Sequence, residues 1–86
     1  MSIENIRNEI DKTDAEIAKL LEKRFELSRQ AATLKKTLAK DVKREKEIIE
    51  RVTSAVPEDM SENIGKIYEK LLAQSRQYQK KMKDKQ

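Results

Sequence analysis

The sequence contains no cysteine and no histidine. These two absences exclude disulfide bonds, thiol nucleophiles, histidine-based catalytic triads and ordinary zinc sites. The chain has one glycine, Gly65, and one proline, Pro57, which is too little turn chemistry for a sheet of many strands. Any chemistry must therefore come from arginine, lysine, carboxylates, amides and hydroxyls.

Long apolar runs are also missing. No run approaches the length of a membrane span and no signal peptide opens the chain, so we expect a cytoplasmic protein without a membrane partner. The net charge is +4 and residues 79–86 are basic, but 16 acidic residues are interspersed and aromatic residues for base stacking are scarce. We therefore predict a solvated, frayed helix end at residues 79–86, in preference to a nucleic-acid-binding patch.

Strong helix formers dominate what remains, chiefly Ala, Leu, Glu, Lys, Arg and Gln. Only 36% of the residues are hydrophobic and 42% are charged, so the core must be thin. A chain of 86 residues is near the size at which a single domain has difficulty burying enough surface to stay folded. The composition therefore predicts one all-α domain over residues 1–86.

Apolar residues recur at steps of three and four in three segments, which predicts three helices. Asp41 can cap the second helix, and Pro57 ends it. Asp59 with Glu62 fits a capping box that opens the third. The predicted helices cover about residues 3–38, 42–55 and 60–82.

The length of the first predicted helix bears on assembly. At 1.5 Å per residue it is about 54 Å long, which exceeds the width of a compact chain of this size. A homodimer with the long helices packed together would shelter their apolar stripes. An extended monomeric helical hairpin or coiled coil is an equally open alternative at this point.

Polar side chains interrupt the apolar stripes of all three predicted helices. Arg24 and Lys35 are eleven residues apart, which on a helix places them on one face, about 16 Å apart. Ser75 and Gln79 lie one turn apart on the third helix, and Glu45 shares the apolar face of the second. Burying such groups without partners would cost several kcal/mol.

Two interpretations of these polar residues are open. They can satisfy one another, with Glu45 neutralising Arg24 or Lys35, or they can line a polar cavity whose excess of cations indicates an anionic ligand. Arg7 lies about 25 Å along the helix from Arg24 and roughly 100° off its face. It cannot reach the same cavity within its own chain, but in an antiparallel dimer it could contribute across the interface.

The arrangement of motifs resembles the all-helical class of chorismate mutases. Residues 6–36 are similar to the first helix of that class, with an early arginine, an Ile-Asp pair, a second aspartate three residues later, Leu-Leu before an arginine, and a lysine further on. Residues 41–52 resemble its second helix, with an Arg-Glu pair ahead of an aliphatic run. Residues 67–79 resemble its third, with serine and glutamine four apart.

The resemblance implies a function and a partner. It implies an intertwined homodimer that converts chorismate, a small dianion, to prephenate on the route to phenylalanine and tyrosine, without cofactor or metal. Arg24, together with Arg7 from the partner chain, would grip the substrate carboxylates. Lys35 would bind a carboxylate and the ether oxygen, and Gln79 would lie on the other side of that oxygen.

The remaining site residues follow by position from the same resemblance. Glu45 would receive the ring hydroxyl, aided by the backbone around Asp41, while Arg44 and Ser75 would support the carboxylate contacts. The connection at residues 37–41 is shorter than is usual in this family and lacks glycine and proline, so the first helix is predicted to run almost to Asp41.

Other interpretations remain. An isochorismate-pyruvate lyase of the same fold is the nearest alternative enzyme, although Glu45 and Gln79 fit the mutase better. A regulatory mutase domain normally fused to another enzyme of the pathway is a second. A non-catalytic helical dimerisation or nucleic-acid-binding module is the third, and steep weakening of duplex binding by salt would identify it.

Overall fold

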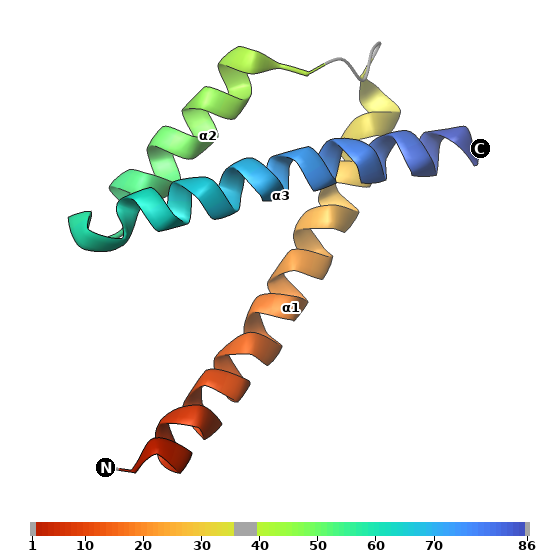
Figure 1. Cartoon of the computed structure of the whole chain (residues 1–86). Helices are drawn as coiled ribbons and strands as arrows, with labels where there is room; N and C mark the ends of the chain where they lie inside the picture. Colours follow the sequence, from red (N-terminus) through yellow and green to blue (C-terminus); the bar gives the residue numbers. More distant parts are fainter. Residues whose placement is uncertain (1, 36–39, 86) are drawn as a thin grey trace.

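The computed structural model describes residues 2–35 and 40–85 and forms them into three α-helices (Figure 1). No strand occurs within these two ranges. The all-α class predicted from the composition is confirmed. The helices are α1 (Ile3–Leu34), α2 (Val42–Ser54) and α3 (Glu58–Asp84).

Side chains cap the first turns of α1 and α2. The Ser2 side chain accepts a hydrogen bond of 3.2 Å from the backbone N–H of Asn5. The Asp41 carboxylate accepts one of 3.0 Å from the backbone N–H of Arg44. Each bond satisfies an N–H group that a helix leaves without a partner in its first turn. The predicted cap at Asp41 is confirmed.

The start of α3 differs from the prediction. Pro57 occupies the N-cap position without a side-chain capping bond, and the helix begins at Glu58. The backbone of Pro57, with φ −58° and ψ 150°, already turns the chain into the helix, and Glu58 and Asp59 complement the positive end of the helix dipole. The predicted capping box of Asp59 and Glu62 is therefore wrong, because Asp59 lies inside the first turn.

The end of α1 also differs from the prediction. The helix stops at Leu34, and Lys35 has an extended backbone with φ −86° and ψ 141°. The Lys83 ammonium, from the last turn of α3, donates to the carbonyl oxygens of Ala32 and Lys35, each at 3.4 Å. The predicted continuation of the helix beyond Leu34 is wrong at Lys35. The ammonium of Lys83 supplies a hydrogen-bond donor to these carbonyl oxygens in place of the next turn of helix. Residues 36–39, and with them most of the short connection, lie outside the described residues.

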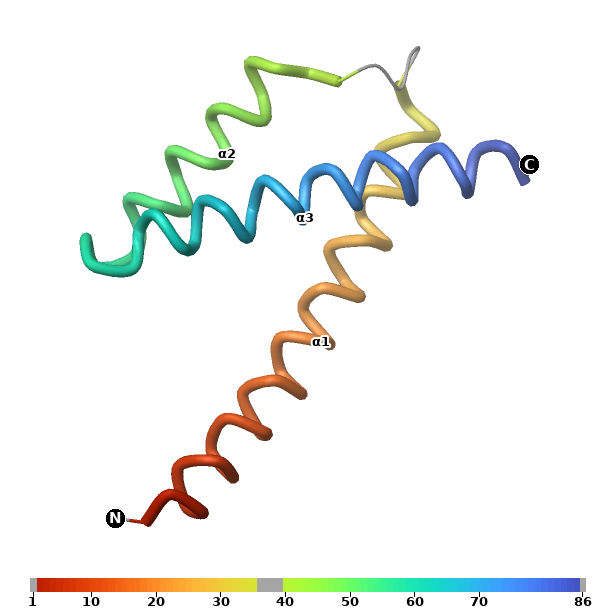
Figure 2. Tube along the Cα trace, in the orientation of Figure 1, coloured from red at the N-terminus to blue at the C-terminus, as the bar shows by residue number. Residues whose placement is uncertain are grey.

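α3 holds the three helices together. It packs against α2 along one part of its length and against the C-terminal half of α1 along another, whereas α1 and α2 do not pack on each other within the described ranges. The trace in Figure 2 shows the N-terminal half of α1 projecting away from both. The molecule is flat and elongated, with extents of 52 × 28 × 14 Å.

Gly65 allows α2 and α3 to approach closely. It is buried, and a Cβ at this position would lie 3.2 Å from Cγ2 of Thr53. The Thr53 hydroxyl donates to the carbonyl oxygen of Ile49 at 2.7 Å, which fixes the rotamer that places its methyl group at this contact. The chain's one glycine is therefore explained by helix packing.

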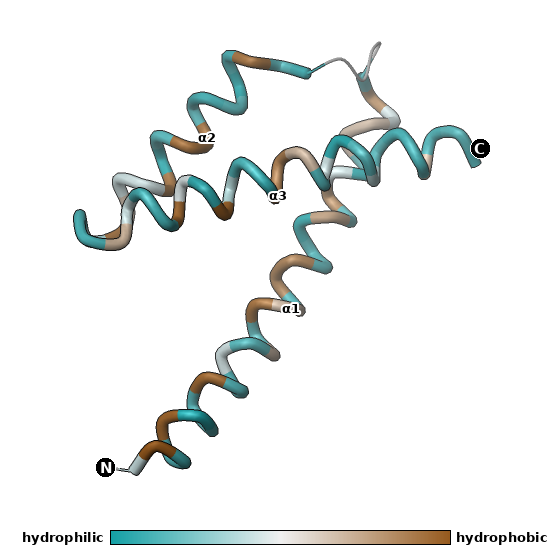
Figure 3. The backbone as a smooth tube through the Cα atoms, viewed as in Figure 1, coloured by the Kyte–Doolittle hydropathy of each residue, from teal (hydrophilic) through white to brown (hydrophobic). Residues whose placement is uncertain are grey.

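The apolar stripe of α1 lies mostly on the surface of the single chain. Ile3, Ile6, Ile10 and Ile17 are between 40% and 58% exposed. Figure 3 shows brown, hydrophobic positions along this projecting half of the helix. The buried apolar core of the described residues is correspondingly small and consists of Ala32 and Leu72. Within those residues, none of the helices combines the length and the apolar character needed to cross a membrane.

Candidate active site

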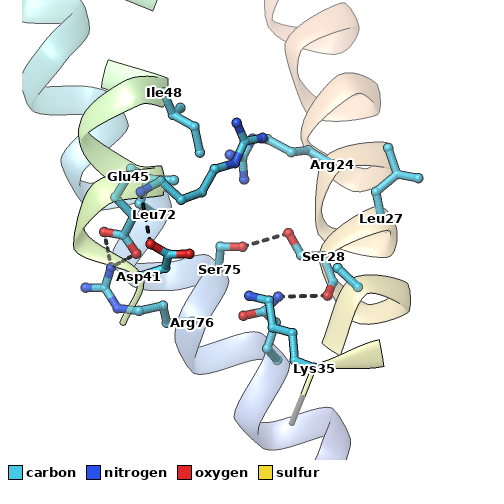
Figure 4. A pocket seen from close by; sticks show the side chains of 13 residues that line it. Arg24, Leu27, Ser28, Lys35, Asp41, Glu45, Ile48, Leu72, Ser75 and Arg76 are labelled. Carbon is cyan, nitrogen blue, oxygen red and sulfur yellow. Dashed lines mark hydrogen bonds and ion pairs between the residues drawn. The ribbon is translucent and has the colours of Figure 1, made fainter. Parts of the chain in front are cut away.

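A cavity of about 380 Å³ lies among the C-terminal part of α1, the start of α2 and the second half of α3 (Figure 4). Its volume falls in the range of small-molecule binding sites. Side chains from all three helices line it, as does Lys35 just past the end of α1. Seven residues that the sequence singled out are brought together here: Arg24, Lys35, Asp41, Arg44, Glu45, Ser75 and Gln79.

Arg7 is the predicted site residue that the structure leaves apart. It is exposed near the start of α1, does not line the cavity, and pairs with Glu4 at 3.2 Å. This position agrees with the helical geometry, which ruled out contact with the cavity of the same chain.

Two polar lining residues were missed by the sequence analysis, Ser28 and Arg76. Ser28 lies one turn after Arg24, so its position on the face of that arginine was a usable signal. No local signal marks Arg76, because the residue it contacts is 31 positions away. The other lining residues are apolar: Leu27, Ala31, Ile48 and Leu72.

The polar groups of α3 are buried against α1. Ser75 is 7% exposed and Gln79 is 6% exposed. The hydroxyls of Ser75 and Ser28 are hydrogen-bonded at 2.8 Å, and Nε2 of Gln79 donates to the backbone carbonyl oxygen of Ser28 at 2.8 Å. Within the described residues, no buried side-chain nitrogen or oxygen lacks a partner. Hydrogen bonds between polar residues therefore explain how Ser75 and Gln79 can be buried. Ser28 is the partner in both of these bonds.

Glu45 is held by a residue other than those expected. Nη1 of Arg76 donates to both carboxylate oxygens of Glu45, each at 2.5 Å. The Glu45 side chain is 15% exposed and that of Arg76 is 31% exposed. The expectation that Glu45 neutralises Arg24 or Lys35 is therefore wrong, because the crossing of α2 and α3 brings Arg76 to it first.

Arg24 is half-buried and its guanidinium lies over the ring of Tyr68, with Cζ 5.8 Å from the ring centroid. A cation–π contact orients the guanidinium without neutralising its charge. Lys35 and Arg44 are exposed in the single chain and line the same cavity. Within the part of the chain that the structure describes, these three cations form no ion pair.

The charged side chains around the cavity are unbalanced. Four cations and two carboxylates line it, an excess of two positive charges. Arg76 pairs with one carboxylate, Glu45, and Asp41 caps α2 with the other. The electrostatic field in the cavity therefore favours an anion. Three cations remain to bind it: Arg24, Lys35 and Arg44.

Fold and cavity together define an all-α protein with a small, polar, positively charged site at a helix crossing. The model of the chorismate mutase type II family matches residues 6–80, and the chain belongs to this family of isomerases. The resemblance seen in the sequence is confirmed. Searches of curated proteins and of solved structures gave no significant match.

Proposed function

We propose that this protein is a chorismate mutase, which rearranges chorismate to prephenate on the route to phenylalanine and tyrosine. The observation that carries the proposal is the cavity with two excess positive charges, since chorismate is a dianion of small-molecule size. Membership in the chorismate mutase type II family supports the type of reaction.

The reaction suits the residues present. Chorismate rearranges within one molecule: the ether C–O bond breaks as a new C–C bond forms, and no proton, electron or group has to leave. What the protein must supply is a binding site that selects the compact conformer, in which the reacting carbons are close. Arg24 of α1, together with Arg7 of the partner chain, would hold the two carboxylates, and Arg44 of α2 would support these contacts. Binding energy is thereby used to select the reactive conformer.

Lys35 and Gln79 would stabilise the negative charge that develops on the ether oxygen. One N–H of the Gln79 amide is tied to the carbonyl oxygen of Ser28, and the same bond orients the second N–H. A fixed donor of this kind is typically worth about 3 to 4 kcal/mol of the barrier, because it needs no reorganisation during the reaction.

The remaining residues would position the substrate. Glu45 would accept the hydrogen bond of the ring hydroxyl, since its carboxylate is ordered by Arg76 at the cavity wall. Ser75 would contact a carboxylate, and the backbone around Asp41 would lie near the ring hydroxyl. No cofactor or metal is part of the proposal.

We propose further that the active protein is a homodimer in which Arg7 of each chain completes the cavity of the other. The support is the exposed apolar face of α1, which includes Ile6, Ile10 and Ile17, and the distance of Arg7 from its own cavity. Packing these faces in antiparallel fashion would bury them and carry the start of one α1 toward the cavity of its partner.

The activity is tested by following the loss of chorismate absorbance with purified protein. Prephenate is the expected product, whereas release of pyruvate would indicate a lyase. Arg24→Ala and Lys35→Ala should each lower kcat/KM by about a hundredfold or more. Lys66→Ala is the control, because Lys66 pairs with Glu62 outside the cavity. Loss of chorismate no faster than in buffer would overturn the proposal.

Subunit complementation tests the shared site. Arg7→Ala and Arg24→Ala chains, each nearly inactive alone, are mixed, unfolded and refolded together. A mixed dimer contains one cavity with both arginines intact, so activity should return to about a quarter of the wild-type value per chain. No recovery, together with a mass in solution equal to one chain, would contradict the shared site.

A further inference from the structure

Arg76 links α3 to α2 at the cavity wall. Its Nη1 donates to both carboxylate oxygens of Glu45 at 2.5 Å, although the two residues are 31 positions apart (Figure 4). The contact is largely shielded from solvent, since the Glu45 side chain is 15% exposed. It is also the one ion pair between different helices among the described residues.

The pair leaves Glu45 able to bind a ligand. A carboxylate has about four acceptor positions, two on each oxygen. Arg76 occupies one position on each oxygen, so each keeps another for a hydroxyl donor. The guanidinium also restricts the rotation of a long side chain whose free rotamers carry about 1.5 to 2 kcal/mol of entropy.

The same two side chains also border a second hollow. A groove of about 570 Å³ between α2 and α3 is lined by Glu45 and Arg76 together with Lys46, Ile49 and Glu69. Because Glu45 and Arg76 line both hollows, the ion pair stands between the cavity and this groove. Without the guanidinium, water from the groove would compete for the carboxylate.

We propose that Arg76 is a positioning residue, which holds the Glu45 carboxylate at the cavity wall in the orientation that receives the substrate hydroxyl. The inference rests on the proposed function, because it requires Glu45 to bind that hydroxyl. Arg76 itself need not touch the substrate. Its effect is on affinity, because the hydroxyl contact exists both in the bound substrate and in the transition state.

The test is steady-state kinetics of Arg76→Met, which keeps an unbranched side chain and removes the donors. KM should rise about tenfold while kcat stays within about threefold, the pattern of lost uniform binding. Arg76→Lys retains a charged donor and should recover most of the affinity. A KM for Arg76→Met within about twofold of wild type, or below it, would overturn the inference.

A purely structural role is separated by two controls. Arg29→Met removes an arginine of similar exposure, 37%, from its pair with Glu26 outside the cavity, and should leave KM unchanged. In a Glu45→Gln background, Arg76→Met should raise KM no further, because the residue acts through the carboxylate. A further rise in that background, beyond about threefold, would show that Arg76 acts by another route.

Folding and function are kept apart in the same experiment. Each variant is assayed at a temperature at which circular dichroism shows it to be folded, and Arg76→Gln takes the place of Arg76→Met if the latter does not fold. An inactive wild-type protein would overturn the proposed function itself. An active wild-type protein with an unchanged KM in Arg76→Met would overturn the positioning role alone.

Discussion

Nε2 of Gln79 in α3 donates a hydrogen bond of 2.8 Å to the backbone carbonyl oxygen of Ser28 in α1. A carbonyl oxygen only accepts hydrogen bonds, so this contact requires a donor on the side chain of residue 79. The bond also lies at the buried crossing of the two helices, where Gln79 is 6% exposed. The same amide therefore serves both the packing of the helices and the proposed chemistry.

Gln79→Glu should make activity and stability depend on pH. An amide donates at any pH, so wild-type activity should be nearly flat across neutral pH, whereas the introduced carboxyl donates only when protonated and should support activity mainly in acid. Ionisation would set two acceptors against each other at Ser28, so the pKa of the introduced carboxyl should be raised in the folded state. The measurement is kcat/KM between about pH 4.5 and 8.

The stability of Gln79→Glu follows from the same shift. A raised folded-state pKa means that the folded state binds the proton more tightly than the unfolded state. The free energy of unfolding should therefore fall as pH rises above about 4.3, the ordinary value for glutamate, until the folded-state pKa is passed. Gln74→Glu, at an exposed position of α3, is the control. Wild-type activity that drops sharply above about pH 6 would contradict the role of Gln79.

The hydroxyl pair of Ser28 and Ser75 should show strong coupling. Ser28→Ala or Ser75→Ala leaves the other hydroxyl, buried in Ser75 and half-buried in Ser28, without this 2.8 Å partner, at a cost of about 1 to 3 kcal/mol. The double variant removes both groups, so it should cost clearly less than the sum of the single changes. Urea unfolding measures all three, with Ser54→Ala at an exposed site as the control. Additive losses would show that the two hydroxyls do not depend on each other.

Gly65→Ala should fail to stabilise α3 although alanine is the better helix former by about 1 kcal/mol. The added Cβ would lie 3.2 Å from Cγ2 of Thr53, which is too close for ordinary contact. Thr53→Ser removes that methyl group and keeps the hydroxyl bond to Ile49. In the Thr53→Ser background, Gly65→Ala should raise the free energy of unfolding by about 1 kcal/mol. Equal effects in both backgrounds would contradict this packing argument.

The half-exposed pair of Glu26 and Arg29 should shift the pKa of each partner in opposite directions. A hydrogen bond from Arg29 lowers the pKa of Glu26, and Glu26 in turn raises the pKa of Arg29. Because the folded-state pKa of Glu26 is below its unfolded value, the pair stabilises the fold above that unfolded value. This contribution is lost as pH falls through the folded-state pKa.

Arg29→Met should move the pKa of Glu26 upward, toward its ordinary value, since the hydrogen bond that lowers it is gone. Carbon NMR titration of the Glu26 carboxyl in the wild type and the variant measures the change. High salt should reduce the difference between the two proteins, because exposed charges are screened. An unchanged pKa in Arg29→Met would show that the pair does not persist in solution.

The sequence was sufficient where structure depends on near neighbours. Apolar spacing predicted three helices, and the cap at Asp41 followed from a residue three positions before its donor. Arg24, Glu45 and Gln79 were found because polar groups on apolar helix faces need a partner or a ligand. Family motifs then assigned the site residues, and the structure brings seven of them together.

Tertiary structure decided what depends on residues far apart in the chain. Arg76 binds the Glu45 carboxylate from 31 positions away and orders the cavity wall. Lys83 donates to the carbonyl oxygen of Lys35 from 48 positions away, just past the end of α1. Neither contact leaves a periodic or local trace, because it exists only once α3 has crossed the other two helices. Spacing within a helix therefore determined which residues share a face, and the crossing of the helices determined which of them meet.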